Sequence, residues 1–347
     1  MLLYEQKMGY KDNPSLWAEK MEKNEAYAEI AKETSDEHKD LLEKMNVVGV
    51  GAGNKIKDGD DTGEPCITVL VSRRVPESEL ASKDLVEQTI KGYKTDVIET
   101  GEILAGTHES MQEELDQGYE IQTLRQKIRP VMGGFSVGHY RITAGTIATC
   151  VYPMEPFPCV PQRYFILSNN HVLANSNNAR FGDPIIQPGR YDGGAVPRDI
   201  VAKLYRWVPI KFKTASATPI NYVDAAIAEG DFHNLNREVY WIGYVKQVNS
   251  RPMIGDIVQK TGRTTNYSTG KIMALHATVD VNYGGGRVAR FADQIVTSNM
   301  SAGGDSGSLV CDIKEGVVGL LFAGSSRVTI VNSILHVQRL LGIRLHP

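Results

Sequence analysis

Cysteine is scarce in this chain of 347 residues, which contains only Cys66, Cys150, Cys159 and Cys311. Four scattered cysteines are too few to hold a chain of this length together, which excludes a disulfide scaffold. No run of about 18 consecutive apolar residues is present, so the sequence predicts no transmembrane helix. The first residues carry no basic segment followed by an apolar one, and we therefore expect no secretory signal and a cytoplasmic location.

An excess of either charge is also missing. Lysine and arginine number 38 against 41 for aspartate and glutamate, which gives a formal net charge of −3. A chain without a basic excess is not expected to bind nucleic acid or an anionic membrane. With 41% hydrophobic and 23% charged residues, the composition is typical of a globular protein, and 347 residues can form more than one core.

Residues 1–45 are predicted to form a helical arm. Apolar residues recur there at helical spacing, and Asn13-Pro14-Ser15 is a typical helix start. The segment Thr34-Ser35-Asp36-Glu37 predicts a break, with a second helix capped near Ser35. The arm either packs on the rest of the protein or serves self-association.

Residues 46–126 are predicted to form a small α+β domain that ends in a polar linker from residue 101. Strand-like and helix-like patterns alternate there around a turn-rich segment from Asp58 to Glu64. The expected elements are strands at 46–50, 65–72 and 93–98 and a helix from Pro76 to Ile90.

Residues 127–347 are predicted to form a mainly β domain. From about Gly133, short β-like runs alternate with clusters of Gly, Pro, Asn and Ser at intervals of roughly ten residues, which is typical of an all-β sandwich or barrel. Helical periodicity returns only near the C-terminus, where residues Asn332 to Leu341 predict one helix.

The motif most suggestive of chemistry is Gly303-Gly304-Asp305-Ser306-Gly307-Ser308. Its glycines allow close backbone approach, and two inward-facing amides could hold an oxyanion, so Ser306 is the candidate nucleophile. Gly-Asp-Ser-Gly would occur by chance in about one chain in a hundred of this length, so the motif needs a partner base to be informative.

His171 is the best-placed base among eight histidines. It follows the apolar run Phe165-Ile166-Leu167 and would be held at the end of a buried strand. Asp224 precedes four small or apolar residues, so its carboxylate is expected to be buried, which is costly unless it is hydrogen-bonded. The Nδ1–H of His171 is the expected partner. The alternatives are a structural histidine and an aspartate that caps a turn.

The order His171, Asp224, Ser306 resembles that of the chymotrypsin-like (trypsin-like) serine peptidases. The resemblance extends to four local segments, Thr143 to Ile147, Asn169 to Leu173, Asp224 to Ala228 and Lys260 to Gly270. Together these matches cover about residues 131–340 and leave the first 130 residues unexplained. The resemblance implies a chymotrypsin-like double β-barrel and a serine endopeptidase that cleaves protein or peptide substrates through an acyl-enzyme.

The resemblance also implies a role for each site residue. Ser306 would attack the peptide carbonyl, His171 would transfer the proton, and Asp224 would orient the imidazole. The backbone amides of Gly304 and Ser306 would form the oxyanion hole. The substrate pocket would consist of Met300 at its base and Phe322, Ala323 and Gly324 at its walls, which implies preference for a small or apolar side chain.

Two departures from the family pattern matter. Val172 stands where secreted members carry a cysteine, in agreement with a cytoplasmic location. The segment Val131 to Gly134 resembles the N-terminus that activation frees in digestive members, but it follows Pro130, a poor cleavage junction. We therefore expect no activation of that kind, and the sequence identifies no partner for Asp305.

The sequence thus predicts a serine endopeptidase that needs no cofactor and no metal. Gly49-Val-Gly-Ala-Gly53 lacks the rest of a dinucleotide-binding motif, and the acidic turn after Asp58 lacks the glutamate of a calcium loop. One alternative is a catalytically silent trypsin-like fold that acts as a binding or scaffold module, and another is an esterase with the same triad. We expect residues 1–126 to regulate the site or to bind a regulatory partner or a second copy, because they exceed what the barrels require.

Overall fold

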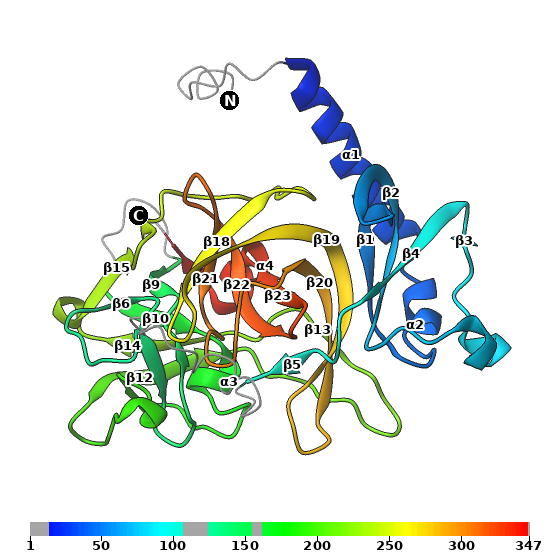
Figure 1. Ribbon diagram of the computed structural model, residues 1–347. Helices are drawn as coiled ribbons and strands as arrows, with labels where there is room; N and C mark the ends of the chain where they lie inside the picture. The colour runs from blue at the N-terminus through cyan, green and yellow to red at the C-terminus, as the bar shows by residue number, and fades with distance from the viewer. Residues whose placement is uncertain (1–13, 107–123, 155–161, 346–347) are drawn as a thin grey trace, which may run out of the picture.

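A computed structural model describes residues 14–106, 124–154 and 162–345, and only the backbone of residues 14–20. The described chain consists mainly of β-strands in two barrels, with a short helix near the C-terminus and an extension at the N-terminus (Figure 1). This arrangement confirms the mainly β, double-barrel fold predicted from the sequence.

The first barrel combines an eight-stranded and a three-stranded sheet. The larger sheet has the order β24 (Ile343–Arg344), β9 (Thr149–Pro153), β10 (Tyr164–Ser168), β14 (Ala226–Gly230), β12 (Ile200–Trp207), β11 (Pro184–Ile186), β7 (Ser136–His139) and β8 (Gly145–Thr146). The smaller sheet contains β16 (Gly243–Tyr244), β15 (Leu235–Val239) and β6 (Val131–Gly133). Strand β10 is apolar along its length because successive side chains point to opposite faces, and both faces pack in apolar clusters.

The second barrel belongs to a thirteen-stranded sheet. Its strands pair in the order β18 (Ile257–Gly262), β19 (Asn266–Asn282), β20 (Val288–Ser298), β23 (Val328–Ser333), β22 (Gly316–Gly324) and β21 (Leu309–Asp312). The barrel closes because β18 also pairs with β21. Two further short strands pair in parallel with strands of this barrel: β13 (Ile220–Asn221) with β20, and β17 (Gln247–Val248) with β22.

The N-terminal strands continue the sheet of the second barrel. They are β1 (Val47–Lys57), β2 (Asp60–Val71), β4 (Tyr93–Glu99) and β3 (Thr89–Ile90), in that order outward from β19 (Figure 1). Strand β1 pairs antiparallel with β19, with Gly49 opposite Val279. A further strand, β5 (Leu104–Ala105), pairs with both β19 and β22. The region is therefore hydrogen-bonded into the second barrel, and its boundary at residue 126 stays a prediction.

The prediction of a helix from Pro76 to Ile90 is wrong. The segment instead forms two short 3₁₀ turns, Glu77–Glu79 and Ser82–Asp84, and then strand β3. Short helices in proteins owe most of their stability to a packed apolar face. The apolar side chains of this segment are only half-buried, so a helix here would have no such face.

The predicted helical arm is present and breaks where expected. Helices α1 (Pro14–Glu33) and α2 (Glu37–Leu41) are separated by three residues. The C-terminal end of α1 packs on the β1–β2 hairpin, where Tyr27 and Ile30 are buried among apolar residues of both strands. The other end of α1 points away from the barrels (Figure 1).

His38 of α2 is buried and makes its side-chain hydrogen bond to Thr34. Burial lowers the pKa of His38 to about 4. The unfolded chain therefore takes up this proton more readily, so His38 leaves the free energy of unfolding unaffected above about pH 6.5 and lowers it as the pH falls towards 4.

We expect the wild-type protein to lose about 2 kcal/mol more unfolding free energy than His38→Gln between pH 7 and pH 4.5. Glutamine stays neutral over this range and can still form a hydrogen bond. Urea unfolding of both proteins at the two pH values measures the difference, and equal losses would contradict a neutral, buried His38.

The C-terminal helix α4 (Ile334–Leu341) joins the two barrels. Ile334, Val337 and Leu341 lie on one face and are buried in an apolar cluster that also holds Phe165 of the first barrel and Leu320 of the second. The predicted helix is confirmed but starts two residues later, because Asn332 and Ser333 still belong to β23. In the described part of the chain, no helix is long and apolar enough to cross a membrane.

Candidate active site

The pairing of β10 with β14 brings His171 and Asp224 together. These strands are antiparallel, with Ser168 opposite Ala226, so the end of one strand lies beside the start of the other. His171 follows β10 on the short helix α3 (Asn170–Leu173), and Asp224 lies two residues before β14. The end of an apolar strand therefore places the histidine as the sequence predicted.

The Asp224 carboxylate is fully buried and holds the imidazole of His171. Its Oδ2 lies 2.6 Å from His171 Nδ1, and its Oδ1 accepts the backbone amide of His171 at 3.1 Å. A carboxylate can only accept here, so Nδ1 carries the proton and the Nε2 of a neutral ring is left as an acceptor. Nε2 is buried and has no hydrogen-bond partner among the described residues. The imidazole is thus oriented with one nitrogen available as a base.

A residue of the second barrel also contacts the carboxylate. Tyr283, which follows β19, donates its hydroxyl to Asp224 Oδ2 at 2.7 Å. Burial, and then the charge of Asp224, raise the pKa of Tyr283 well above its ordinary value, so the phenol remains a donor. Asn332 accepts the backbone amide of Asp224 at 3.0 Å. Both barrels therefore fix the position of this aspartate.

Ser306 lies in the loop between β20 and β21, at the junction of the barrels. Its carbonyl accepts the backbone amide of Thr146 at 2.8 Å. A Cβ at Gly145 would lie 3.0 Å from this carbonyl oxygen and would overlap Val172, the neighbour of His171. At Gly307, where φ is +96°, a Cβ would overlap Ser168 and Thr146. Glycine at both positions lets the serine loop approach the histidine segment.

The backbone of this loop leaves two amides without an acceptor. The amides of Asp305, Gly307 and Ser308 donate to backbone carbonyls. For the amides of Gly304 and Ser306, no acceptor exists within the described chain. The Gly304 carbonyl accepts the Thr146 hydroxyl at 2.9 Å, which fixes the turn. Amides held in this way can stabilise a negative charge that develops beside Ser306.

Asp305 is paired with Lys260, a residue that the sequence had not identified as its partner. Lys260 Nζ lies 3.1 Å from Asp305 Oδ2, and both side chains are fully buried. The carboxylate also accepts amides of Thr264 and Ala302 and the Thr265 hydroxyl. Burial would raise the pKa of Asp305, but the charge of Lys260 and these hydrogen bonds outweigh it and hold that pKa below its ordinary value. No freed N-terminus is needed to neutralise this aspartate.

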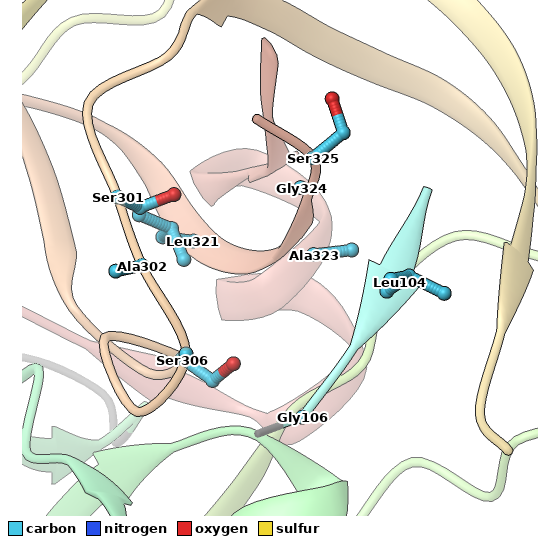
Figure 2. Close-up of a pocket in the computed structure, with 10 residues that line it drawn as sticks. Leu104, Gly106, Ser301, Ala302, Ser306, Leu321, Ala323, Gly324 and Ser325 are labelled. Atoms are coloured by element: carbon cyan, nitrogen blue, oxygen red, sulfur yellow. The ribbon is translucent and has the colours of Figure 1, made fainter. Parts of the chain in front are cut away.

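A pocket opens beside Ser306 between the serine loop and the end of β22 (Figure 2). It is lined by residues of the serine loop and by residues in or next to β22 and β5, namely Ser301, Ala302, Gly303, Ser306, Leu321, Ala323, Gly324, Ser325, Leu104 and Gly106. Met300 and Phe322, which the sequence placed in this pocket, do not line it. Both side chains are buried in apolar clusters of the second barrel. Phe322 points into the core because alternate residues of β22 point to opposite sides, and Met300 is buried where the chain leaves β20.

Several solved protease structures are similar to this chain. Protease A of Thermobifida fusca matches 62% of this chain and 98% of its own at 15% identity and a TM-score of 0.44. A chymotrypsin of Cellulomonas bogoriensis matches 62% and 97% at 18% identity and a TM-score of 0.42, and a Nocardiopsis protease 62% and 99% at 17% and 0.44. This chain resembles the bacterial chymotrypsin-like serine proteases. No family model and no curated protein sequence matches it.

Sequence reasoning missed Tyr283 as a hydrogen-bond partner of Asp224 and Lys260 as the partner of Asp305. Lys260 could have been found, because it shares the inward face of a strand with Val258 and Gly262. An unpaired lysine on that face would be costly. Tyr283 gave no such signal, because it follows a long strand and lies 59 residues from Asp224 in the sequence.

Proposed function

We propose that this chain is a serine endopeptidase that hydrolyses peptide bonds with Ser306, His171 and Asp224. One observation carries the proposal: a buried carboxylate holds the imidazole, and within the described chain its second nitrogen and two amides of the neighbouring serine loop have no hydrogen-bond partner. A structural histidine would have both nitrogens satisfied when buried.

The proposed reaction has two halves. Ser306 Oγ attacks the carbonyl carbon while His171 Nε2 takes its proton, and the oxyanion is bound by the amides of Gly304 and Ser306. Each such donor is worth roughly 3 kcal/mol of barrier. The C–N bond then breaks, and His171 gives the proton to the leaving amine. Water repeats the sequence on the acyl-enzyme and releases the acid.

Labelling with a fluorophosphonate tests the proposal. We expect the purified full-length protein to gain the mass of one adduct, because the phosphonate phosphorus reacts with an activated serine hydroxyl. Ser306→Ala and His171→Ala should both abolish the adduct. Ser301→Ala is the matched control, since Ser301 lines the same pocket and should leave labelling intact.

The two alternatives give different results in this experiment. A binding or scaffold module would give no adduct in any variant. An esterase would be labelled but would hydrolyse ester and not amide versions of the same chromogenic peptide. Cleavage of the amide version by the wild-type protein and not by Ser306→Ala supports an endopeptidase.

We further propose that the N-terminal region before residue 127 regulates this site or binds a partner or a second copy, and that the protein acts in the cytoplasm. The pairing of β1 and β5 with the second barrel supports a regulatory role. Strand β1 pairs with β19, which directly precedes Tyr283, and β5 pairs with β22, whose end lines the pocket beside Ser306. Fractionation of the cells that produce it would test the location.

A further inference from the structure

Strand β5 occupies a place where the barrel itself would have a free edge. Leu104 and Ala105 pair antiparallel with the end of β22, with Ala105 opposite Ala323 and Leu104 opposite Gly324. On its other side, Leu104 pairs in parallel with Asn282 of β19. The segment comes from the N-terminal region: Leu104 lies 178 residues before Asn282, and Ala105 lies 218 residues before Ala323.

The segment is anchored just before β5. Ile103 is fully buried among apolar residues of the second barrel. Its carbonyl accepts the amide of Asn282 at 3.0 Å, and the Asn282 side chain donates to Glu102 at 2.7 Å. Ser325 donates its hydroxyl to the carbonyl of Thr100. After this anchor, residues 104–106 are only half-buried, so they can separate from β22 while Ile103 stays in place.

The end of β5 lies at the candidate nucleophile. Leu104 and Gly106 line the pocket that contains Ser306, and Figure 2 shows Gly106 at the end of β5 nearer to that serine. A peptide that binds by adding a strand to a sheet edge is extended and takes its affinity from main-chain hydrogen bonds. A peptide substrate paired with β22 would lie where β5 lies.

We propose that Gly101–Gly106 is an internal peptide ligand that occupies the substrate strand of the site and lowers its activity on other peptides. The inference rests on the proposed function. Gly106 places no side chain in the pocket beneath it, and the walls formed there by Ser301, Ala302, Ala323 and Gly324 carry no charge. The substrates that displace β5 are extended peptides with a small uncharged side chain at this pocket.

Loosening β5 without replacing His171, Asp224 or Ser306 tests the proposal. Leu104→Asp places a charge on the half-buried strand, and Leu80→Asp makes the same change at a half-buried leucine of the same region, outside the pocket beside Ser306. We expect Leu104→Asp to raise kcat/KM for a chromogenic peptide with alanine at the cleavage site about tenfold or more, since the groove becomes free more often. Leu80→Asp should change it less than about twofold.

A second measurement covers the case in which Leu104→Asp folds poorly. A synthetic peptide with the sequence of residues 99–106 should inhibit the wild-type protein competitively, as a free copy of the internal ligand. A chain fragment that ends at Gly106 in the intact mass of the wild-type protein would also support the placement, because a segment bound as a substrate presents its own bond to Ser306.

Two results separate this inference from the proposed function. If Ser306 reacts with the fluorophosphonate, but Leu104→Asp is folded with unchanged kcat/KM and the peptide does not inhibit, β5 is a structural strand and the inference fails. If neither the wild-type protein nor Leu104→Asp is labelled, the proposed function itself fails.

Discussion

Replacing Asp224 by asparagine is expected to lower kcat about 10⁴-fold, as for the equivalent change in a serine–histidine–aspartate triad. The amide keeps the shape of the carboxylate but can donate to Nδ1, which moves the ring proton to Nε2. Nε2 then cannot take the proton of Ser306. Asp224 is fully buried and does not line the pocket, so KM should change little. Steady-state kinetics on a chromogenic peptide measures both constants.

Tyr283→Phe is the matched comparison, because it removes the other hydrogen bond to the same Asp224 oxygen. The hydrogen bond from His171 to Asp224 remains, so we expect kcat to fall only about tenfold. A hydrogen bond to a charged group is worth about 1.5–3 kcal/mol, and only part of that energy changes between the ground state and the transition state. Equal losses in the two variants would argue against a special role of the carboxylate. Circular dichroism establishes that both variants fold.

Lys260→Met is expected to reduce the free energy of unfolding by about 3–5 kcal/mol. Methionine fills a similar volume but leaves the Asp305 carboxylate buried without a cation. Its remaining partners are the amides and the hydroxyl of the neighbouring loop. Because Asp305 directly precedes Ser306, fluorophosphonate labelling should decline as well. Urea is the suitable denaturant, since it does not screen ion pairs as guanidinium chloride does.

Lys271→Met provides the control for that experiment. Lys271 Nζ lies 3.5 Å from Asp61 Oδ2, but its side chain is 48% exposed. An exposed pair of this kind contributes about 0–1 kcal/mol, so the variant should unfold close to the wild-type midpoint. If Lys260→Met unfolded at the same urea concentration as Lys271→Met, the ion pair with Lys260 would not be what stabilises the buried carboxylate of Asp305.

The sequence predicted what depends on local pattern. Alternating apolar runs indicated the barrels, and the apolar strand before His171 indicated a rigid position for that side chain. The unusual apolar surroundings of Asp224 indicated that its carboxylate is buried and paired, as it is with His171. These inferences use only neighbours in the chain, where side-chain direction follows from strand geometry.

The sequence could not predict what depends on distant pairing. The family resemblance placed Met300 and Phe322 in the pocket, but it does not reveal which side chains of this chain point into the core. The predicted helix after Pro76 failed because the apolar side chains of that segment are only half-buried. Strand β5 lay inside a segment interpreted as a linker, since two residues carry no periodicity and their partners lie far along the chain.

The pairing of β1 with β19 has a consequence for synthesis on the ribosome. Gly49 can pair with Val279 only after about 230 further residues have been synthesised. At roughly 5–20 residues per second, their synthesis takes about ten to fifty seconds. During that time the β1–β2 hairpin has an unpaired edge, a hazard for aggregation that a chaperone could cover. Ser306 emerges later still, so the proposed peptidase activity cannot arise until nearly all of these strands have been made.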